Sequence, residues 1–121
     1  MRFDPGENVA TVRLADARVR KAVRLIDLEI NDARLSVAHV AGALGLSERR
    51  LREIFTAGLG VGPKQYICES RLRAARALLE ASSLSVKEAM AASGFSDPSH
   101  FSRQYKRLFG APPSKSRDLP G

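Results

Sequence analysis

The chain has 121 residues, the length of one domain or of two very small ones that share a helix. Its twenty Lys and Arg residues, fifteen of them Arg, oppose thirteen Asp and Glu residues, giving a net charge of +7 and a pI near 10.3. This balance favours a polyanionic partner, although a basic surface can also serve solubility alone. One cysteine, Cys68, excludes an internal disulfide and a cysteine-rich zinc site, and no apolar run reaches the length of a membrane span. We expect a cytoplasmic protein without cofactors.

The first part of the chain predicts a tail and then a helix. Residues 1–11 contain Gly, Pro and charged residues without periodicity, so we expect a disordered tail or a linker remnant. From about Asp16 to Asn31, apolar residues recur at spacings of four, three and four, which is typical of an amphipathic helix. They are Val19, Val23, Ile26 and Ile30.

A pair of helices follows at once. Ser36 predicts the N-cap of a helix over Val37–Leu44, and the three residues Gly45-Leu46-Ser47 leave room only for a tight turn. Ser47–Phe55 then predicts a second helix, whose sides carry several arginines. This order is the helix-turn-helix pattern, in which the second helix enters the major groove of DNA.

The two helices have distinct apolar positions. The second is expected to bury Leu51, Ile54 and Phe55, which lie on one face. Ala41 and Gly45 are small and four residues apart, so we expect them to let the two helices cross closely.

A long helix is predicted next. Gly58–Pro63 is rich in Gly and ends in Pro, which indicates a helix stop followed by a new first turn. The helix is expected over Lys64–Glu80 and to end at Ser82-Ser83, with apolar positions Tyr66, Ile67, Leu72, Ala75, Leu78 and Leu79.

The pattern then recurs about fifty residues later. Leu35-Ser36-Val37 returns as Leu84-Ser85-Val86, and Gly45 returns as Gly94. Ser85 and Glu88 form a capping box, while Asp97 is expected to cap the second such helix, with Pro98 at its first position. After one inserted residue the matches continue, with Leu51, Phe55, Leu59, Gly60 and Pro63 returning as Phe101, Tyr105, Phe109, Gly110 and Pro113. Two copies of a helix-turn-helix pattern joined by one long helix are a far more specific signal than either copy alone.

The second copy carries a family signature. Its residues are Arg71-Leu72 with Ala75 and Leu78-Leu79, the run from Gly94 to Arg107, and then Gly110 and Pro113. Over roughly residues 19–117 the chain resembles the DNA-binding domain of AraC/XylS-type transcriptional regulators. The resemblance implies an all-α, seven-helix, bipartite fold with two recognition helices in neighbouring major grooves on one face of the DNA. It also implies a longer regulator with an effector-sensing or dimerising domain, although short members exist.

The expected division is a first helix-turn-helix subdomain over residues 12–62, a linker helix over 63–81, a second subdomain over 82–117 and a tail over 118–121. Two residues depart from the family pattern. Met90 replaces the usual small Ala, and we expect it to widen the second helix pair. Ser116 replaces the usual aromatic residue, and we expect a last helix that is less firmly packed.

Base-reading candidates lie opposite the apolar face of each recognition helix. The first helix offers Arg49, Arg52 and Glu53, at positions that read bases in similar proteins. Arginine can bind guanine bidentately and glutamate can accept from cytosine N4, so we expect GC pairs in this half-site. An alternative is that Glu48 and Glu53 only pair with these arginines at a solvated surface. The second helix offers Ser99, His100, Ser102 and Arg103.

Further residues are expected to bind phosphate, either through a charge or through the backbone at a helix N-terminus. These are Ser36, Arg50, Lys64, Arg71, Ser85, Lys87, Lys106, Arg107 and Lys115. The linker helix would span roughly 25 Å. With the subdomain radii, this allows recognition helices ~34 Å apart, which is one DNA turn and requires some bending of the duplex.

Other functions find less support in the sequence. His39 and His100 have no Cys or carboxylate partner in a catalytic or metal-binding pattern, so we expect neither an enzyme nor a metal site. The stronger rival is a helical module that binds protein, for example RNA polymerase, because exposed arginines also suit acidic protein surfaces. The sequence does not give the operator, the effector or the direction of regulation.

Overall fold

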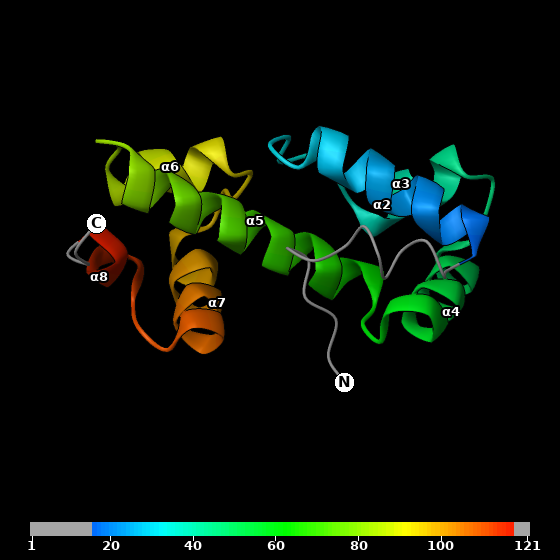
Figure 1. Ribbon diagram of the computed structural model, residues 1–121. Helices are drawn as coiled ribbons and strands as arrows, with labels where there is room; N and C mark the ends of the chain where they lie inside the picture. Colours follow the sequence, from blue (N-terminus) through cyan, green and yellow to red (C-terminus); the bar gives the residue numbers. More distant parts are fainter. Residues whose placement is uncertain (1–15, 118–121) are drawn as a thin grey trace. The chain divides into compact units, whose positions relative to one another are not determined.

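The computed structural model describes residues 16–117, which form helices joined by short turns, with no β-strand among them (Figure 1). The seven helices in this range are α2 (Ala17–Glu29), α3 (Val37–Ala43), α4 (Glu48–Leu59), α5 (Pro63–Ala81), α6 (Val86–Ala92), α7 (Pro98–Phe109) and α8 (Pro113–Arg117). The all-α, seven-helix class expected from the sequence is confirmed. The two expected tails, residues 1–11 and 118–121, lie outside the described range.

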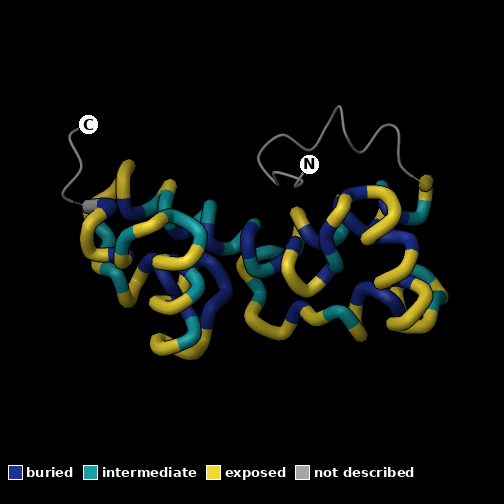
Figure 2. Tube along the Cα trace, turned by 90° about the horizontal axis from the view of Figure 1, so that it is seen from below, coloured by how far each residue is buried: buried dark blue, intermediate teal, exposed yellow. Residues whose placement is uncertain are grey.

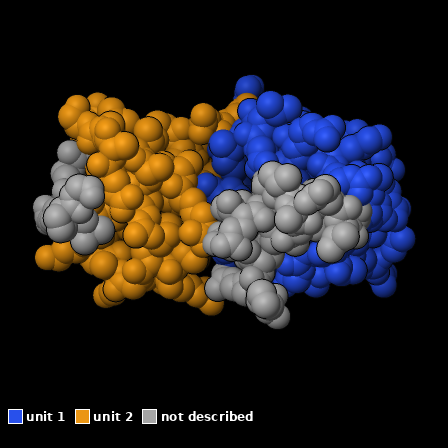
Figure 3. All heavy atoms as spheres, in the orientation of Figure 1, with its two compact units in different colours: residues 1–30, 34–70 blue, residues 31–33, 71–121 orange. Residues whose placement is uncertain are grey.

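The chain divides into two compact units (Figure 3). Unit 1 contains the residues up to Ile30 together with Arg34–Ser70, and unit 2 contains Asn31–Ala33 together with Arg71 and the residues that follow. The division falls inside α5, so this single helix contributes to both units. In each unit, buried positions alternate with exposed ones along the helices (Figure 2), as amphipathic periodicity requires.

Side chains cap the helices as the sequence predicts. The hydroxyl oxygens of Ser36 and Ser47 accept hydrogen bonds from the backbone N–H groups of His39 and Arg50, at 3.1 and 3.0 Å. At the start of α6, Ser85 and Glu88 exchange bonds of 2.8 and 3.1 Å and form the expected capping box. These caps satisfy amides that have no partner within the helix.

Helix α4 is longer than expected. The sequence suggested a stop after Phe55, but the helix continues through Gly58 to Leu59. The residue that ends it is Gly60, which adopts the left-handed conformation at φ +79° and donates its N–H to the carbonyl of Thr56 at 2.8 Å. Glycine inside a helix weakens it by only ~1 kcal/mol, and burial of Leu59 offsets this.

The role expected of Gly45 was wrong. A Cβ atom built on this residue would meet nothing within 4 Å, so no neighbouring helix requires glycine through close contact. The requirement comes from the backbone, because Gly45 has φ +71° in the turn between α3 and α4. Its N–H donates to the carbonyl of Gly42 at 3.1 Å.

The core of unit 1 is mostly aliphatic. The recognition helix α4 buries Leu51, Ile54 and Phe55, as expected, and Phe55 meets Tyr66 of α5 edge-on at 5.4 Å between ring centroids. Contributions from the other helices and loops complete this core, namely Val19, Ala22, Val23, Ile26, Leu35, Val40, Ala41, Leu59, Val61 and Ile67. Ile30 lies at the end of α2 and is only half-buried.

Unit 2 has a more aromatic interior. Ring centroids of Phe95 and Phe101 lie 4.9 Å apart, those of Phe101 and Tyr105 lie 5.6 Å apart, and Tyr105 meets Phe109 at 4.6 Å. The guanidinium of Arg76 on α5 lies 4.7 Å from the Phe109 ring centroid. Leu108 of α7 is half-buried.

Compensating exchanges relate the two units. At the offset that relates Gly45 to Gly94, Ala41 corresponds to Met90 and Leu44 to Ser93. Met90 is buried, and the buried hydroxyl of Ser93 donates to the carbonyls of Ala89 and Met90 at 2.8 and 3.0 Å. One large and one small residue therefore occupy this side of the helix in either unit, which argues against the widening expected from Met90 alone.

A second exchange concerns Ser116. At the offset that relates Pro63 to Pro113, Phe55 and Tyr66 correspond to Tyr105 and Ser116. Instead of an aromatic pair, unit 2 has a buried hydrogen bond between the hydroxyl groups of Tyr105 and Ser116, which ties α8 to α7. Ser116 is buried, so the expectation of a loosely packed last helix was wrong.

Helix α5 has two correspondences within the repeat. Its first turns, with Pro63 and Tyr66, match α8 and close unit 1. Its later turns match α2, because the offset that relates Gly45 to Gly94 relates Val23 to Leu72 and Ile26 to Ala75, and all four of these side chains are buried.

Candidate nucleic-acid interface

The first recognition helix, α4, turns its polar side chains outward because its apolar face is buried in the core of unit 1. The side chain of Arg49 is 85% exposed, that of Arg52 56% and that of Glu53 51%. The three base-reading candidates of this helix therefore lie on its accessible side, as the sequence predicts. Exposed arginine and glutamate side chains have the hydrogen-bonding groups that read guanine and cytosine in the major groove.

Ion pairs within α4 occupy these side chains in the DNA-free structure. The carboxylate of Glu53 lies 3.6 Å from Nε of Arg49 and 3.4 Å from Nη1 of Arg50. Glu48 lies 3.9 Å from Nη1 of Arg52. The pairing that the sequence left as an alternative is thus present. Exposed pairs of this kind contribute only ~0.3–0.5 kcal/mol each, so they do not preclude contact with bases.

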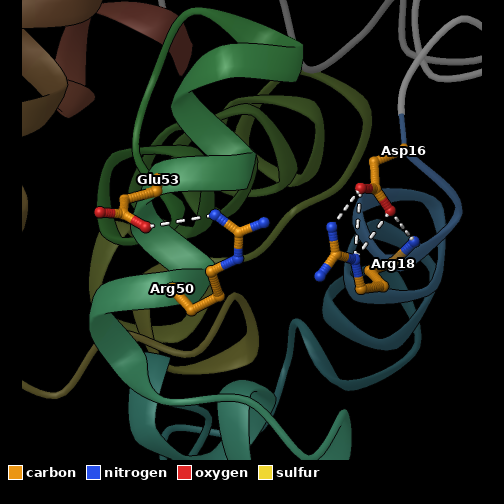
Figure 4. A network of polar contacts seen from close by, with 4 residues as sticks. All are labelled: Asp16, Arg18, Arg50 and Glu53. Carbon is orange, nitrogen blue, oxygen red and sulfur yellow. Dashed lines mark hydrogen bonds and ion pairs between the residues drawn. The ribbon is translucent and has the colours of Figure 1, made fainter.

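The start of α2 adds charged groups beside α4. Figure 4 shows the guanidinium of Arg50 between Glu53 and the pair formed by Asp16 and Arg18. Arg18 donates to both carboxylate oxygens of Asp16, with Nη2 at 2.6 Å. These hydrogen bonds and the backbone N–H of Arg18 lower the pKa of Asp16 to about 2, and the charge of Arg50 also lowers it.

Sequence reasoning missed this neighbourhood. An Asp directly before an amphipathic segment is an N-cap signal, and Asp16 does accept the N–H of Arg18 at 2.7 Å. That signal could have identified the cap. The proximity of Asp16 to Arg50 on another helix has no sequence signature.

The second recognition helix, α7, begins as expected. Asp97 accepts the backbone N–H groups of Ser99 and His100 at 3.0 and 3.3 Å, and Pro98 occupies the first helical position. Burial of Phe101 and Tyr105 turns the opposite face outward.

The base-reading candidates of α7 differ in accessibility. Ser99, Ser102 and Arg103 are exposed. His100 is half-buried, and its ring lies 6.1 Å from that of Phe95, so only part of the imidazole is accessible. Of the four candidates, Arg103 combines exposure with a guanidinium group.

The cations of α7 contrast with those of α4. Arg103, Lys106 and Arg107 are exposed, and none of them forms an ion pair with any residue in the range 16–117. Lys106 and Arg107 lie in the last turn, where they also favour the negative end of the helix dipole.

Phosphate candidates fall into two groups. Lys64, Lys87 and Lys115 are exposed in the first turns of α5, α6 and α8. The hydroxyls of Ser36 and Ser85 serve as caps, and the carboxylate of Glu88 accepts the N–H of Ser85.

The structure gives Arg71 a different partner from the one expected. It is half-buried, and Nη2 donates to the backbone carbonyl of Asp32 at 2.6 Å. This bond ties the segment Asn31–Ala33 to α5 within unit 2. This bond gives Arg71 a structural role, and the phosphate contact expected of it stays a prediction.

No cluster of three or more His, Cys, Asp or Glu residues within the described range has the arrangement of a metal site. His39, instead, lies 3.1 Å from Glu29 through Nε2. Cys68 is a half-buried thiol on α5. Within residues 16–117, no helix is long and apolar enough to cross a membrane.

Comparison with known proteins gives consistent matches. The sequence profile of a family described as a helix-turn-helix domain matches residues 40–118. The chain is 35% identical over 94 residues to a transcriptional activator, NphR, from a Rhodococcus species, covering 78% of this chain and 28% of that protein. It thus spans about a quarter of the length of this curated relative.

Solved structures share the fold. A transcriptional regulator from Chromobacterium violaceum, described as AraC-type DNA-binding domain-containing, is 36% identical, with a TM-score of 0.76 over 86% of this chain and 95% of that one. The DNA-binding domain of AdpA, solved with a target DNA, has a TM-score of 0.79 at 24% identity, over 85% of this chain and 92% of that one.

Proposed function

Since the chain belongs to the AraC-type family of helix-turn-helix transcriptional regulators, we propose that it binds duplex DNA sequence-specifically, with α4 and α7 reading two major-groove segments. The observation that carries this proposal is that both helices, each capped after a tight turn, bury their apolar faces and expose polar ones. The relatives are regulators of transcription, and we propose no catalytic activity.

Helix α4 is proposed to read a GC-containing half-site. Arg49 and Arg52 can each donate two hydrogen bonds to O6 and N7 of guanine, and Glu53 can accept from N4 of cytosine. Each good bidentate contact discriminates against the wrong base by ~1–3 kcal/mol. The high exposure of these side chains supports the assignment, since little has to move before they meet a base.

Helix α7 is proposed to read the second half-site mainly through Arg103, with Ser99 and Ser102 as adaptable hydroxyl contacts. His100 would contribute only its accessible edge. The serine hydroxyls of α7 can donate to or accept from several base edges, so the half-site that α7 reads is expected to be the less stringent of the two.

Phosphate contacts are proposed for Arg50 and for five residues at or near helix ends. The latter are Lys64, Lys87, Lys106, Arg107 and Lys115. Such contacts fix the register of a protein on the duplex and carry little sequence information. The linker helix α5 has 19 residues and is therefore roughly 28 Å long, which suits two half-sites about one DNA turn apart, with some bending of the duplex.

A contact with RNA polymerase is a second proposed function. Leu28 on α2 is 79% exposed and is the large apolar side chain that stands out on the surface of the described residues. A single exposed leucine is common, but on the surface of a transcriptional regulator it suits a weak contact with another protein. Leu28→Ala should then lower transcription from a target promoter and leave the affinity for DNA unchanged.

The relative NphR is much longer than this chain. We propose that effector sensing or dimerisation, where it occurs, belongs to a further domain. We also propose that the domain acts in the bacterial cytoplasm, at the nucleoid, without a cofactor.

The deciding experiment is selection of binding sites from a random duplex library by the unmodified chain and by Arg52→Ala and Arg103→Ala. We expect one enriched motif with two blocks about one turn apart. Each variant should relax one block and preserve the other. If no motif is enriched by the unmodified chain, sequence-specific binding by this domain is wrong, and a protein partner becomes the better proposal.

A further inference from the structure

The exposed face of α4 is nearly neutralised by its own carboxylates. Each of its three arginines lies within ion-pair distance of a glutamate on the same helix, at 3.4–3.9 Å. Glu53 alone lies beside two of them, Arg49 and Arg50. The carboxylate of Asp16 also lies near Arg50, but it is paired with Arg18, so it leaves the net charge beside α4 unchanged (Figure 4).

Helix α7, in contrast, carries cations that no carboxylate within the described range neutralises. Its exposed face carries Arg103, Lys106 and Arg107, which have no ion-pair partner among residues 16–117. Its carboxylate is the N-cap Asp97, whose side chain accepts two backbone amides at the start of the helix. The two recognition helices therefore differ in free positive charge, although they share a fold.

This difference has a physical consequence for binding. A cation that neutralises a phosphate releases condensed counterions, and this sequence-independent term dominates binding to arbitrary DNA. An arginine already paired with a carboxylate gains less from a phosphate, and the carboxylate itself is repelled by the phosphate. At a cytosine, however, the carboxylate accepts a hydrogen bond from N4, so the repulsion is offset only where the sequence is correct.

We propose that Glu53 is a specificity-determining residue, which suppresses the binding of α4 to arbitrary phosphates, whereas the unpaired cations of α7 supply most of the salt-dependent affinity. Glu48 acts in the same way on Arg52. This inference rests on the proposed DNA binding, but it concerns affinity for DNA of any sequence, so it can be tested before the operator is known.

The test uses Glu53→Gln, which removes the charge and keeps the shape. Its probe is an unselected random-sequence duplex of fixed length, and the affinity is measured by fluorescence anisotropy at several salt concentrations. Each additional phosphate that the protein neutralises makes the slope of log K against log[salt] steeper by ~0.9, which is roughly a 3-fold change in affinity between about 50 and 200 mM salt. We expect Glu53→Gln to bind this probe more tightly than the unmodified chain, with a slope steeper by ~0.9.

A matched control is available on α5. Glu80 pairs with Arg76 at 3.0 Å with the same i,i+4 spacing, and the side chains of Arg76 and Glu80 are 42% and 40% exposed. Glu80→Gln adds the same net charge outside the recognition helices, so its slope should stay close to that of the unmodified chain. An equal rise in affinity for Glu53→Gln and Glu80→Gln would mean that only net charge matters and would overturn the inference.

The second arm of the test concerns α7. Lys106→Gln removes one unpaired cation and should make the slope shallower by ~0.9. An unchanged slope for Lys106→Gln, or for Glu53→Gln, contradicts the inference while leaving DNA binding intact. If the unmodified chain does not bind the duplex even at low salt, the proposed function itself fails. Circular dichroism of each variant checks that the helices are retained.

Discussion

Tyr105 of α7 and Ser116 of α8 share a buried hydrogen bond between their side-chain hydroxyl groups. Ser116→Ala leaves the phenol of Tyr105 without this partner in a buried position, which typically destabilises a protein by ~1–3 kcal/mol. We expect a fall of this size in the free energy of unfolding, measured in urea. Adding Tyr105→Phe should recover part of the loss, because both polar groups are then absent. Equal stability of Ser116→Ala and the unmodified chain would show that the hydrogen bond contributes nothing.

Arg71 donates a hydrogen bond to the carbonyl of Asp32, so a variant of Arg71 can distinguish a structural role from a phosphate contact. We expect Arg71→Met to lower the free energy of unfolding by ~1.5–3 kcal/mol, since hydrogen bonds from charged donors contribute about this much. The salt dependence of DNA binding should remain unchanged. The opposite result, intact stability with a slope shallower by ~0.9, would restore Arg71 as a phosphate ligand.

Lowering the pH should weaken the N-cap of α2, because protonation of Asp16 removes its negative charge. The side-chain hydrogen bonds from Arg18 lower the pKa of Asp16 from 3.8 to about 2, so the folded state favours the ionised carboxylate. A lowered pKa stabilises the fold at pH values above 3.8, and this contribution is lost as the pH falls toward about 2. Asp16→Asn keeps an oxygen for the cap but cannot titrate. In thermal unfolding between about pH 5 and pH 2, this variant should lose less stability than the unmodified chain.

The exchange between Ala41 with Leu44 and Met90 with Ser93 predicts a paired effect. Met90→Ala alone should leave a cavity in unit 2 and lower the free energy of unfolding by ~2–5 kcal/mol. Adding Ser93→Leu restores the arrangement of unit 1 and should recover part of this loss. Double-mutant analysis of urea unfolding measures the coupling. Simple additivity of the two changes would show that the side chains do not share the same space.

The parts of the fold that depend on local signals were predictable. Ser47 and Asp97 indicate the starts of their helices because an N-cap acts on amides two or three residues away. The ion pairs of Glu53 follow from helical spacing, which is why they could be weighed as an alternative.

The parts that depend on tertiary contact were not predictable from spacing. The bond from Arg71 ends on a backbone carbonyl, and any residue at position 32 would offer one. The proximity of Asp16 to Arg50 arises only when α2 packs near α4. The hydrogen bond of Ser116, however, could have been predicted from the repeat. The second copy has Ser116 in place of an aromatic residue, and at the paired position it has Tyr105, which carries a hydroxyl group, in place of Phe55.

The double correspondence of α5 bears on how such a protein is assembled from copies. Three helices, α2 to α4, correspond to α5 to α7, and a further helix is needed only to close the last copy, as α8 does. A DNA-reading segment of this type can therefore be duplicated by adding three helices rather than four. Because α5 serves as the closing helix of unit 1 and as the opening helix of unit 2, the chain cannot be cut between two helices without one unit losing its share of α5.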